Sequence, residues 1–377
     1  MTLPRVPVKK TRPDIGRFLK AMAGQILPDR PPLVEYLIDP AVMRPILEDL
    51  LGRTWVDPPD SVGPMGGRKD VTAGMTGFVD AWLDNQIAFW CGMGYDFIRA
   101  EVPLPLPAVS SVAEDTATGH YGLKRTWQGL HEGLIRTWDD FEEYPWPEVG
   151  DEDFYIHRYI SAHLPDGMGF LTCHAGGVYE QASRLLGYET LCLMIYENPT
   201  LLRAVIDRLG GLIFKYHSRL FELDRVSAIF QGEDLGFRTQ TLLSPGHLRE
   251  YILPWHKKYA ELAHSHGRPY FLHSCGNVSA VMEPLIEEVR IDGKHSFEDS
   301  ILPITKAKEL YGDRICLLGG VDVDKLARLP PPELRTYVRG IIERCAPGGR
   351  FAIGAGNSIP SYIPVENYLA MLDEALC

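Results

Sequence analysis

A histidine and a cysteine stand two positions apart in the stretch YFLHSCGNVSAV, residues 270–281. In an extended strand, residues at this spacing face the same side of the sheet, so His273 and Cys275 could hold one cation together. Imidazole nitrogen and thiolate sulfur are ligands that zinc prefers, and a catalytic zinc takes about three protein ligands and keeps one position open. The alternative is a buried cysteine that acts as a small hydrophobic residue beside a hydrogen-bonded histidine.

Polar side chains close several other short apolar runs of the sequence. These residues are Cys173 and His174, Glu233 and Asp234, His295, Asp322 and Asp324, and Asn357. The adjacent acids Glu233 and Asp234 face opposite sides of an extended chain, so at most one of them is expected to point toward His273. We favour Glu233, as a metal ligand or a catalytic base, and keep Asp234 and His295 as further catalytic candidates.

The stretch CHAGGVYEQ, residues 173–181, is a candidate substrate-binding turn. Its two glycines would let a ligand approach the backbone where a helix begins, although an ordinary strand–helix turn would have the same composition. Asp322 could bind a substrate hydroxyl or cap the helix that follows, and capping is the favoured role. The candidate substrate-binding residues are therefore His174, Tyr179, Asp322 and Asn357.

Eight short apolar or β-branched runs carry most of these residues at their ends, and segments with helical spacing separate the runs. The runs span residues 31–37, 95–101, 167–173, 226–232, 268–274, 289–295, 314–320 and 350–356. One helical segment starts at Ser244-Pro245, an N-cap followed by proline, and stops before Gly267. Its four histidines are expected to be solvated or to cap the helix.

Strand–helix alternation with short connections predicts parallel strands, and eight repeats are the number that closes a barrel. We therefore predict an α/β fold, a (β/α)8 TIM-type barrel with additional N-terminal helices. The predicted boundaries are an arm over residues 1–30 and a single barrel domain over 31–377, with an insertion around 38–94. In such a barrel the chemistry lies at the carboxyl ends of the strands, where the polar residues above are found.

The composition favours a cytoplasmic protein without a nucleic-acid or membrane partner. The net charge is −12, whereas binding to phosphates requires a basic face. The sequence has no apolar stretch of the roughly 20 residues that span a bilayer, and its N-terminus lacks the apolar core of a signal peptide. Seven cysteines without paired spacing indicate free thiols or metal ligands and not a disulfide framework.

Four stretches of the chain resemble the uroporphyrinogen decarboxylase superfamily, whose fold is a (β/α)8 barrel. They begin GVYEQASRLLGYE at residue 177, GEDLGFRTQ at 232, LLGGVDVDKL at 317 and IGAGNSIPSY at 353, and the resemblance covers residues 155–377 well. True uroporphyrinogen decarboxylases carry an arginine-rich MRQAGR segment and an FSDI segment. Here the corresponding regions read LVEYLIDPAVM and YDFIRAE, so decarboxylation of a porphyrinogen is not expected.

The chain is more similar to the cobalamin-dependent methyltransferase branch, which includes methylcobamide:coenzyme M methyltransferases. In that branch H-x-C and a later cysteine bind zinc, which activates a thiol or polarises a methyl donor. His273 and Cys275 match this motif, but the later cysteine is replaced by Ala355. Either Glu233, His295 or Asp234 completes the site, or the site binds no zinc; Cys316 and Cys345 are expected in the core.

The resemblance implies a corrinoid-dependent methyltransferase with a small-molecule methyl donor or acceptor. Methylcobalamin would be carried by a separate corrinoid protein, since the sequence has no D-x-H-x-x-G corrinoid-binding pattern. The alternatives are a decarboxylase or other lyase that acts on a non-porphyrinogen substrate, and a non-catalytic binding barrel. A monomer or a homodimer is expected.

Overall fold

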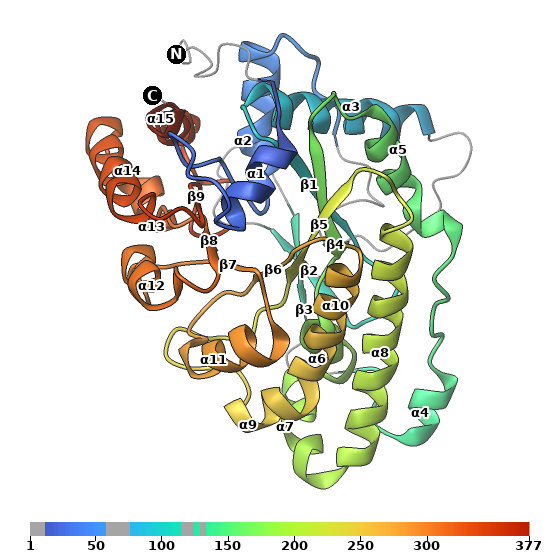
Figure 1. Cartoon of the computed structure of the whole chain (residues 1–377). Coiled ribbons are helices and arrows are strands. Elements are labelled where there is room, and N and C mark those ends of the chain that lie inside the picture. Colours follow the sequence, from blue (N-terminus) through green and yellow to red (C-terminus); the bar gives the residue numbers. More distant parts are fainter. Residues whose placement is uncertain (1–11, 58–75, 115–123, 129–132, 377) are drawn as a thin grey trace.

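The structure is a computed structural model that describes residues 12–57, 76–114, 124–128 and 133–376 (Figure 1). Residues 1–11 of the predicted arm and 58–75 of the predicted insertion lie outside these ranges.

Seven parallel strands form one curved sheet, each hydrogen-bonded to the next. In spatial order they are β1 (Phe97–Val102), β4 (Gly169–His174), β5 (Val226–Gly232), β6 (Tyr270–His273), β7 (Gly293–His295), β8 (Cys316–Leu318) and β9 (Phe351–Ala352). Each strand falls within or overlaps one of the predicted runs. The α/β barrel-type fold is therefore confirmed, with the order of strands in space following their order in sequence.

The first predicted run, residues 31–37, forms an isolated parallel bridge instead of a strand. Leu33 pairs with Ile353 next to β9. The two prolines at the start of the run lack backbone donors, which shortens any ladder there. The segment still lies close to the sheet, because a Cβ added at Gly354 would lie 1.7 Å from the carbonyl oxygen of Val34, an approach that only glycine allows.

Helices pack against the sheet, and four of the described helices precede β1 in the chain (Figure 1). They are α1 (Ile15–Met22), α2 (Pro40–Pro45), η1 (Ile46–Leu50), α3 (Thr76–Gly92), α4 (Trp138–Glu143), η2 (Asp151–Phe154), α5 (Tyr155–His163), α6 (Val178–Leu186), α7 (Tyr188–Glu197), α8 (Pro199–Leu220), α9 (Pro245–His247), η3 (Leu248–Ile252), α10 (Leu253–Ser265), η4 (Ser279–Val281), α11 (Met282–Pro284), η5 (Leu285–Val289), α12 (Ile304–Tyr311), α13 (Val323–Arg328), α14 (Pro331–Cys345) and α15 (Val365–Leu376). The predicted helix after Ser244 is confirmed as the continuous run α9, η3 and α10, with Ser244 accepting a hydrogen bond from the His247 amide.

Helix α1 covers the amino end of the sheet. The Asp14 amide donates to the Asp96 carboxylate just before β1, and the Ile15 amide donates to the carbonyl of Gly167 just before β4. Phe18, fully buried, packs beneath the strands. With this end closed by packing, the carboxyl end is where the loops can form a site.

An antiparallel hairpin of β2 (Ser110–Glu114) and β3 (Lys124–Gln128) was not predicted. Its strands read SSVAE and KRTWQ, which lack the apolar runs by which the other strands were recognised.

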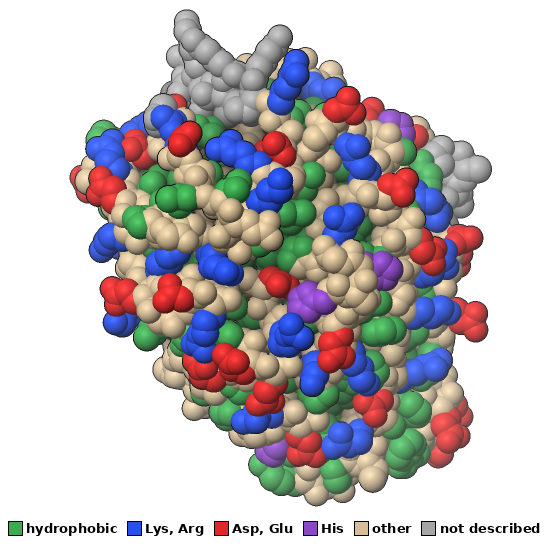
Figure 2. Space-filling model, viewed as in Figure 1, with side chains coloured by type: hydrophobic (Ala, Val, Ile, Leu, Met, Phe, Trp, Pro, Cys, Tyr) green, Lys and Arg blue, Asp and Glu red, His purple; other side chains and the backbone are tan. Residues whose placement is uncertain are grey.

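The surface bears on the expected partners. Within the described ranges, no helix is long and apolar enough to cross a bilayer. Figure 2 shows Lys and Arg side chains interspersed with Asp and Glu over the viewed face, so this face carries no concentrated positive charge.

Candidate functional site

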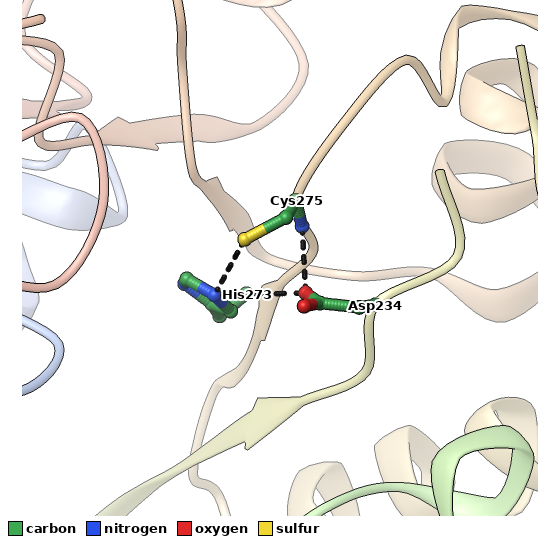
Figure 3. Close-up of side chains that lie close together, drawn as sticks. All are labelled: Asp234, His273 and Cys275. Atoms are coloured by element: carbon green, nitrogen blue, oxygen red, sulfur yellow. Dashed lines mark hydrogen bonds and ion pairs between the residues drawn. The ribbon is translucent and has the colours of Figure 1, made fainter. Parts of the chain in front are cut away.

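Asp234, His273 and Cys275 converge at the carboxyl ends of β5 and β6 (Figure 3). Their ligand atoms, one oxygen, one nitrogen and one sulfur, all lie within 4.8 Å of one another. His273 Nε2 lies 3.3 Å from Cys275 Sγ and 3.8 Å from Asp234 Oδ1. The two residues of the H-x-C motif thus meet at one point, and a carboxylate joins them.

The backbone holds the three residues together by extending the ladder beyond the strands. The Glu233 amide donates to the carbonyl of His273, and the Cys275 amide donates to Asp234 Oδ1 at 2.9 Å. Gly276 then turns the chain with a φ of +74°, and a Cβ there would lie 2.3 Å from the carbonyl carbon of Gly236. Glycine at this turn lets the two loops touch and leaves Cys275 at the mouth.

A chain of hydrogen bonds fixes which nitrogen of His273 carries the proton. His295 Nε2 lies 3.1 Å from the carbonyl oxygen of Ala355, which can only accept, so this nitrogen donates. The neutral His295 therefore accepts at Nδ1 from His273 Nδ1, 2.7 Å away. His273 Nε2 is left as the acceptor nitrogen: its lone pair faces Cys275 and Asp234, and the Cys275 thiol lies within hydrogen-bonding distance at 3.3 Å. A metal ligand requires such an unprotonated nitrogen.

Burial keeps both imidazoles neutral. Desolvation and the neighbouring His295 hold the pKa of His273 well below its usual value. Desolvation also lowers the pKa of His295 to about 3. The lone pair on His273 Nε2 is thus retained at neutral pH, without a proton to displace.

Tyr36 and Arg99 hold the His273 ring in place. The Tyr36 ring stacks on His273 with centroids 3.8 Å apart, and the Arg99 guanidinium lies 3.4 Å from the Tyr36 centroid. At such distances the two groups must occupy opposite faces of the tyrosine. Glu101 then accepts from Tyr36 at 2.9 Å and from Arg99 at 2.6 Å. The sequence signal was the Arg-x-Glu pair inside the apolar run YDFIRAE.

Asn357 donates a hydrogen bond from Nδ2 to Cys275 Sγ at 3.1 Å. Its Oδ1 accepts from the Ser358 amide, which fixes the orientation of the side-chain amide. Burial, and then the charge of Asp234, raise the pKa of the Cys275 thiol above its usual range. A cation at this point would offset both effects and favour the thiolate.

Glu233 does not join the cluster. Its side chain is fully buried, and its two oxygens accept from the amides of Tyr179 and Glu180 at the first turn of α6, at 3.0 and 2.9 Å. His256 Nε2 lies 3.0 Å from the same carboxylate. The structure therefore corrects our preference for Glu233 as the metal ligand: the expected alternation of neighbouring residues holds, but the helix N-terminus takes Glu233 and Asp234 faces His273.

His256 was expected to be solvated or to cap its helix, and the structure corrects this too. Its ring is fully buried, and Nδ1 lies 2.7 Å from the hydroxyl of Tyr270. The helical spacing of α10 contained the signal, because Leu253, His256 and Ala260 share its buried face.

The other predicted site residues are placed as follows. His174 uses both ring nitrogens on backbone groups, accepting from the Leu104 amide and donating to the carbonyl of Gly176. The side chain of Tyr179 is buried in the core, and Asp322 caps α13. His295 contacts His273 at Nδ1, the ring nitrogen that faces away from the cluster. Of these candidates, only Asn357 lines the cavity at the cluster.

That cavity has a volume of about 420 Å³ and is lined by Asp234, His273 and Cys275 among others. Its further charged residues are Glu101, Glu180 and Arg184. Burial, followed by the charges of Asp234 and Glu233, raises the pKa of Glu180 well above its usual value. Beside the cluster, the cavity thus presents two carboxyl groups and one arginine, in a volume suited to a small molecule.

Cys316 and Cys345 lie in the core, as predicted.

Residues 133–375 match the family model described as uroporphyrinogen decarboxylase (URO-D). No curated protein matches the chain significantly in sequence. Among solved structures, a methyltransferase from Methanosarcina mazei superposes with a TM-score of 0.67 at 16% sequence identity, covering 97% of this chain and 98% of that chain. At this identity the likeness shows a shared fold.

Proposed function

The chain belongs to the uroporphyrinogen decarboxylase family, and from that premise we propose that it is a corrinoid-dependent, zinc-assisted methyltransferase and not a porphyrinogen decarboxylase. One observation carries the proposal: Asp234, His273 and Cys275 bring oxygen, nitrogen and sulfur ligand atoms within 4.8 Å of one another on the wall of the cavity.

The donor set fits zinc. Carboxylate, imidazole and thiolate are all zinc ligands, and three of them leave the fourth position for a substrate, as catalytic zinc sites do. Asp234 would supply the ligand that in the family pattern is the cysteine at the position of Ala355. The Ala355 methyl cannot ligate, and the backbone of this residue is occupied by Glu35 and His295.

The residues around the cluster support the same chemistry. When bound, zinc would lower the pKa of a substrate thiol or polarise a methyl donor. His295 keeps the proton of His273 on Nδ1, and Asn357 donates to the sulfur of Cys275. The half-enclosed cavity would hold a small donor or acceptor against the cluster. As the resemblance implies, methylcobalamin would reach this cavity on a separate corrinoid protein.

The test is methyl transfer from methylcobalamin to a small thiol, catalysed by the zinc-loaded protein. The reaction is monitored by the loss of the absorbance of the methyl–cobalt bond. Cys275→Ala and His273→Ala should each lower the rate at least about 100-fold, since loss of one ligand disrupts the metal site. Cys192→Ala, which removes a half-buried cysteine outside the cluster, is the matched control. A wild-type protein that binds no zinc, or ligand variants as active as the wild type, would overturn the proposal.

Uroporphyrinogen is the comparison substrate. It carries many carboxylates, whereas Arg184 is the single arginine or lysine among the described residues that line the cavity, beside three carboxyl groups. No coproporphyrinogen should form with the wild type. Its formation at ordinary enzyme concentration would show that the decarboxylase branch is correct.

A further inference from the structure

Lys294 is a buried lysine beside the cluster, but it lies on the other face of the sheet. It precedes His295 on β7, and alternation along the strand directs the two side chains to opposite faces. His295 contacts His273. Lys294 instead lines a separate small gap with Met282 and Tyr311. It does not line the cavity of the cluster, so it does not touch a substrate held there.

The ammonium group of Lys294 binds two backbone carbonyls. Nζ donates to the carbonyl of Ser296 at 2.6 Å and to the carbonyl of Ser274 at 3.3 Å. It also lies 4.5 Å from the centroid of the Phe297 ring, whose face attracts a cation. Burying an ammonium group costs free energy, which these contacts offset. The lysine therefore joins the chain just after β6 to the chain just after β7.

The carbonyl of Ser274 belongs to the peptide group that orients Asp234. The amide of the same peptide group is that of Cys275, and it donates to Asp234 Oδ1 at 2.9 Å. A cation on the carbonyl oxygen polarises the peptide group and strengthens the hydrogen bond that its N–H donates. Lys294 thus acts on the carboxylate of the cluster through a single peptide group.

The carbonyl of Ser296 leads to the other hydrogen-bond partner of Cys275 in the same way. The amide of this second peptide group is that of Phe297, and it donates to the carbonyl of Gly356 at 2.7 Å. A Cβ at Gly356 would lie 2.1 Å from the carbonyl oxygen of Phe297, so the two segments are in close contact. The next residue, Asn357, donates to Cys275 Sγ. One ammonium group therefore binds both peptide groups that lead to the partners of Cys275.

We propose that Lys294 is a positioning residue of the metal site, which holds Asp234 and Asn357 around Cys275 through these two peptide groups. The inference rests on the proposed function for the metal, but not for the hydrogen bonds. Its consequence is that the ligand geometry is set before a metal binds, by a cation that touches neither metal nor substrate. Preorganisation of this kind lowers the cost of binding.

A double-mutant cycle on zinc affinity tests the inference. Lys294→Met keeps the length of the side chain, removes its donors and should weaken zinc binding about 10-fold in competition with a chelator. In an Asp234→Ala background the same change should cost at most about 3-fold, because the Cys275 amide then has no carboxylate to orient. The matched control is Lys308→Met, since Lys308 also donates to a backbone carbonyl, that of Gly349, but at the amino end of β9. The control should bind zinc as the wild type does.

Cobalt(II) in place of zinc gives a spectroscopic signature of the ligand set. Charge transfer from the thiolate reports Cys275, and the ligand-field bands in the visible region report tetrahedral coordination. Lys294→Met should keep the thiolate band but show weaker ligand-field bands, because Asp234 is no longer held. A variant that had only lost stability would lose both bands in proportion.

The hydrogen bonds are measured without any metal by amide hydrogen exchange. In the metal-free protein, the amides of Cys275 and Phe297 should exchange faster in Lys294→Met than in the wild type, and at the wild-type rate in Lys308→Met. Zinc affinity and cobalt spectra of Lys294→Met that equal those of the wild type, or an undiminished loss in the Asp234→Ala background, would overturn the inference.

The proposed function fails in a different way, namely if the wild type binds no metal or transfers no methyl group. In the first case the exchange rates decide whether Lys294 positions the two peptide groups, and equal rates in Lys294→Met and the wild type would overturn the inference. In the second case the zinc cycle and the cobalt spectra decide it, because neither depends on methyl transfer.

Discussion

Glu233 and Asp234 are neighbours in the chain, but they belong to two different kinds of environment. Glu233 is fully buried and has partners for both oxygens, from the first turn of α6 and from His256, which is held in turn by Tyr270. The Asp234 side chain keeps 44% of its accessible surface and faces the cavity with His273 and Cys275.

The difference separates residues that hold the fold from residues that are available to a ligand. The first set, Glu233 with His256 and Tyr270, is satisfied within the protein and ties α6 to the barrel. In the second set, Asp234, His273 and Cys275 contact one another but leave a nitrogen lone pair, a thiol and a carboxylate directed at one point.

The largest expected effect is on stability. Glu233→Ala should lower the free energy of unfolding by about 3–5 kcal/mol, because it leaves His256 and two buried amides without their acceptor. Asp234→Ala, at the partly exposed neighbouring position, should cost less than about 1 kcal/mol. Chemical denaturation of the two variants would measure both values, and equal losses would remove the distinction between the two environments.

Acid should destabilise the protein through its buried histidines. Desolvation lowers the pKa of His157 and His217 to about 3, and that of His174 to about 4. The unfolded chain protonates these groups near pH 6.5, so their stability contribution is complete above that pH and falls as the pH drops toward 4. Each group should cost up to about 1.4 kcal/mol per pH unit in this range. Unfolding curves that do not change between pH 7 and 5 would contradict the neutral, buried assignment.

Zinc affinity should depend on His295, which accepts a hydrogen bond from the proposed ligand His273. His295→Phe removes the acceptor for His273 Nδ1, frees the other tautomer of His273 and should weaken zinc binding about 10- to 100-fold. The control is His163→Phe on the exposed end of α5. Zinc affinity should also rise with pH, because Cys275 must lose its proton to bind. Competition with a chelator of known affinity would give both results, and an unchanged affinity in His295→Phe would exclude the tautomer argument.

The smallest effect concerns the far end of the fold-holding set. Tyr270→Phe removes the hydroxyl that contacts His256 and should lower the free energy of unfolding by about 1 kcal/mol. Its zinc content should equal that of the wild type. A variant that lost zinc would show that the two sets are not separable.

Sequence patterns were sufficient where one local rule decides the outcome. Parallel strands follow from strand–helix alternation, and the meeting of His273 with Cys275 follows from the two-residue period of a strand. The same period predicted that only one of Glu233 and Asp234 would face the site, but it could not say which. That choice depends on where the N-terminus of α6 lies relative to β5, which is a feature of the tertiary structure.

The supporting residues of the site were missed for the same reason. Tyr36 belongs to a segment that does not form a regular strand, and Arg99 reaches it from β1, 63 positions away. The stacking of Tyr36 between Arg99 and His273 depends on how the sheet curves, which no spacing along the chain encodes.

The central claim is that Asp234, His273 and Cys275, and not Glu233, hold the metal. X-ray absorption at the zinc edge of the zinc-loaded protein tests it most directly. The account predicts one sulfur at about 2.3 Å and nitrogen or oxygen ligands at about 2.0–2.2 Å. The sulfur signal should disappear in Cys275→Ala and remain in Glu233→Gln. A spectrum without a sulfur ligand, or one that Cys275→Ala leaves unchanged, would contradict it.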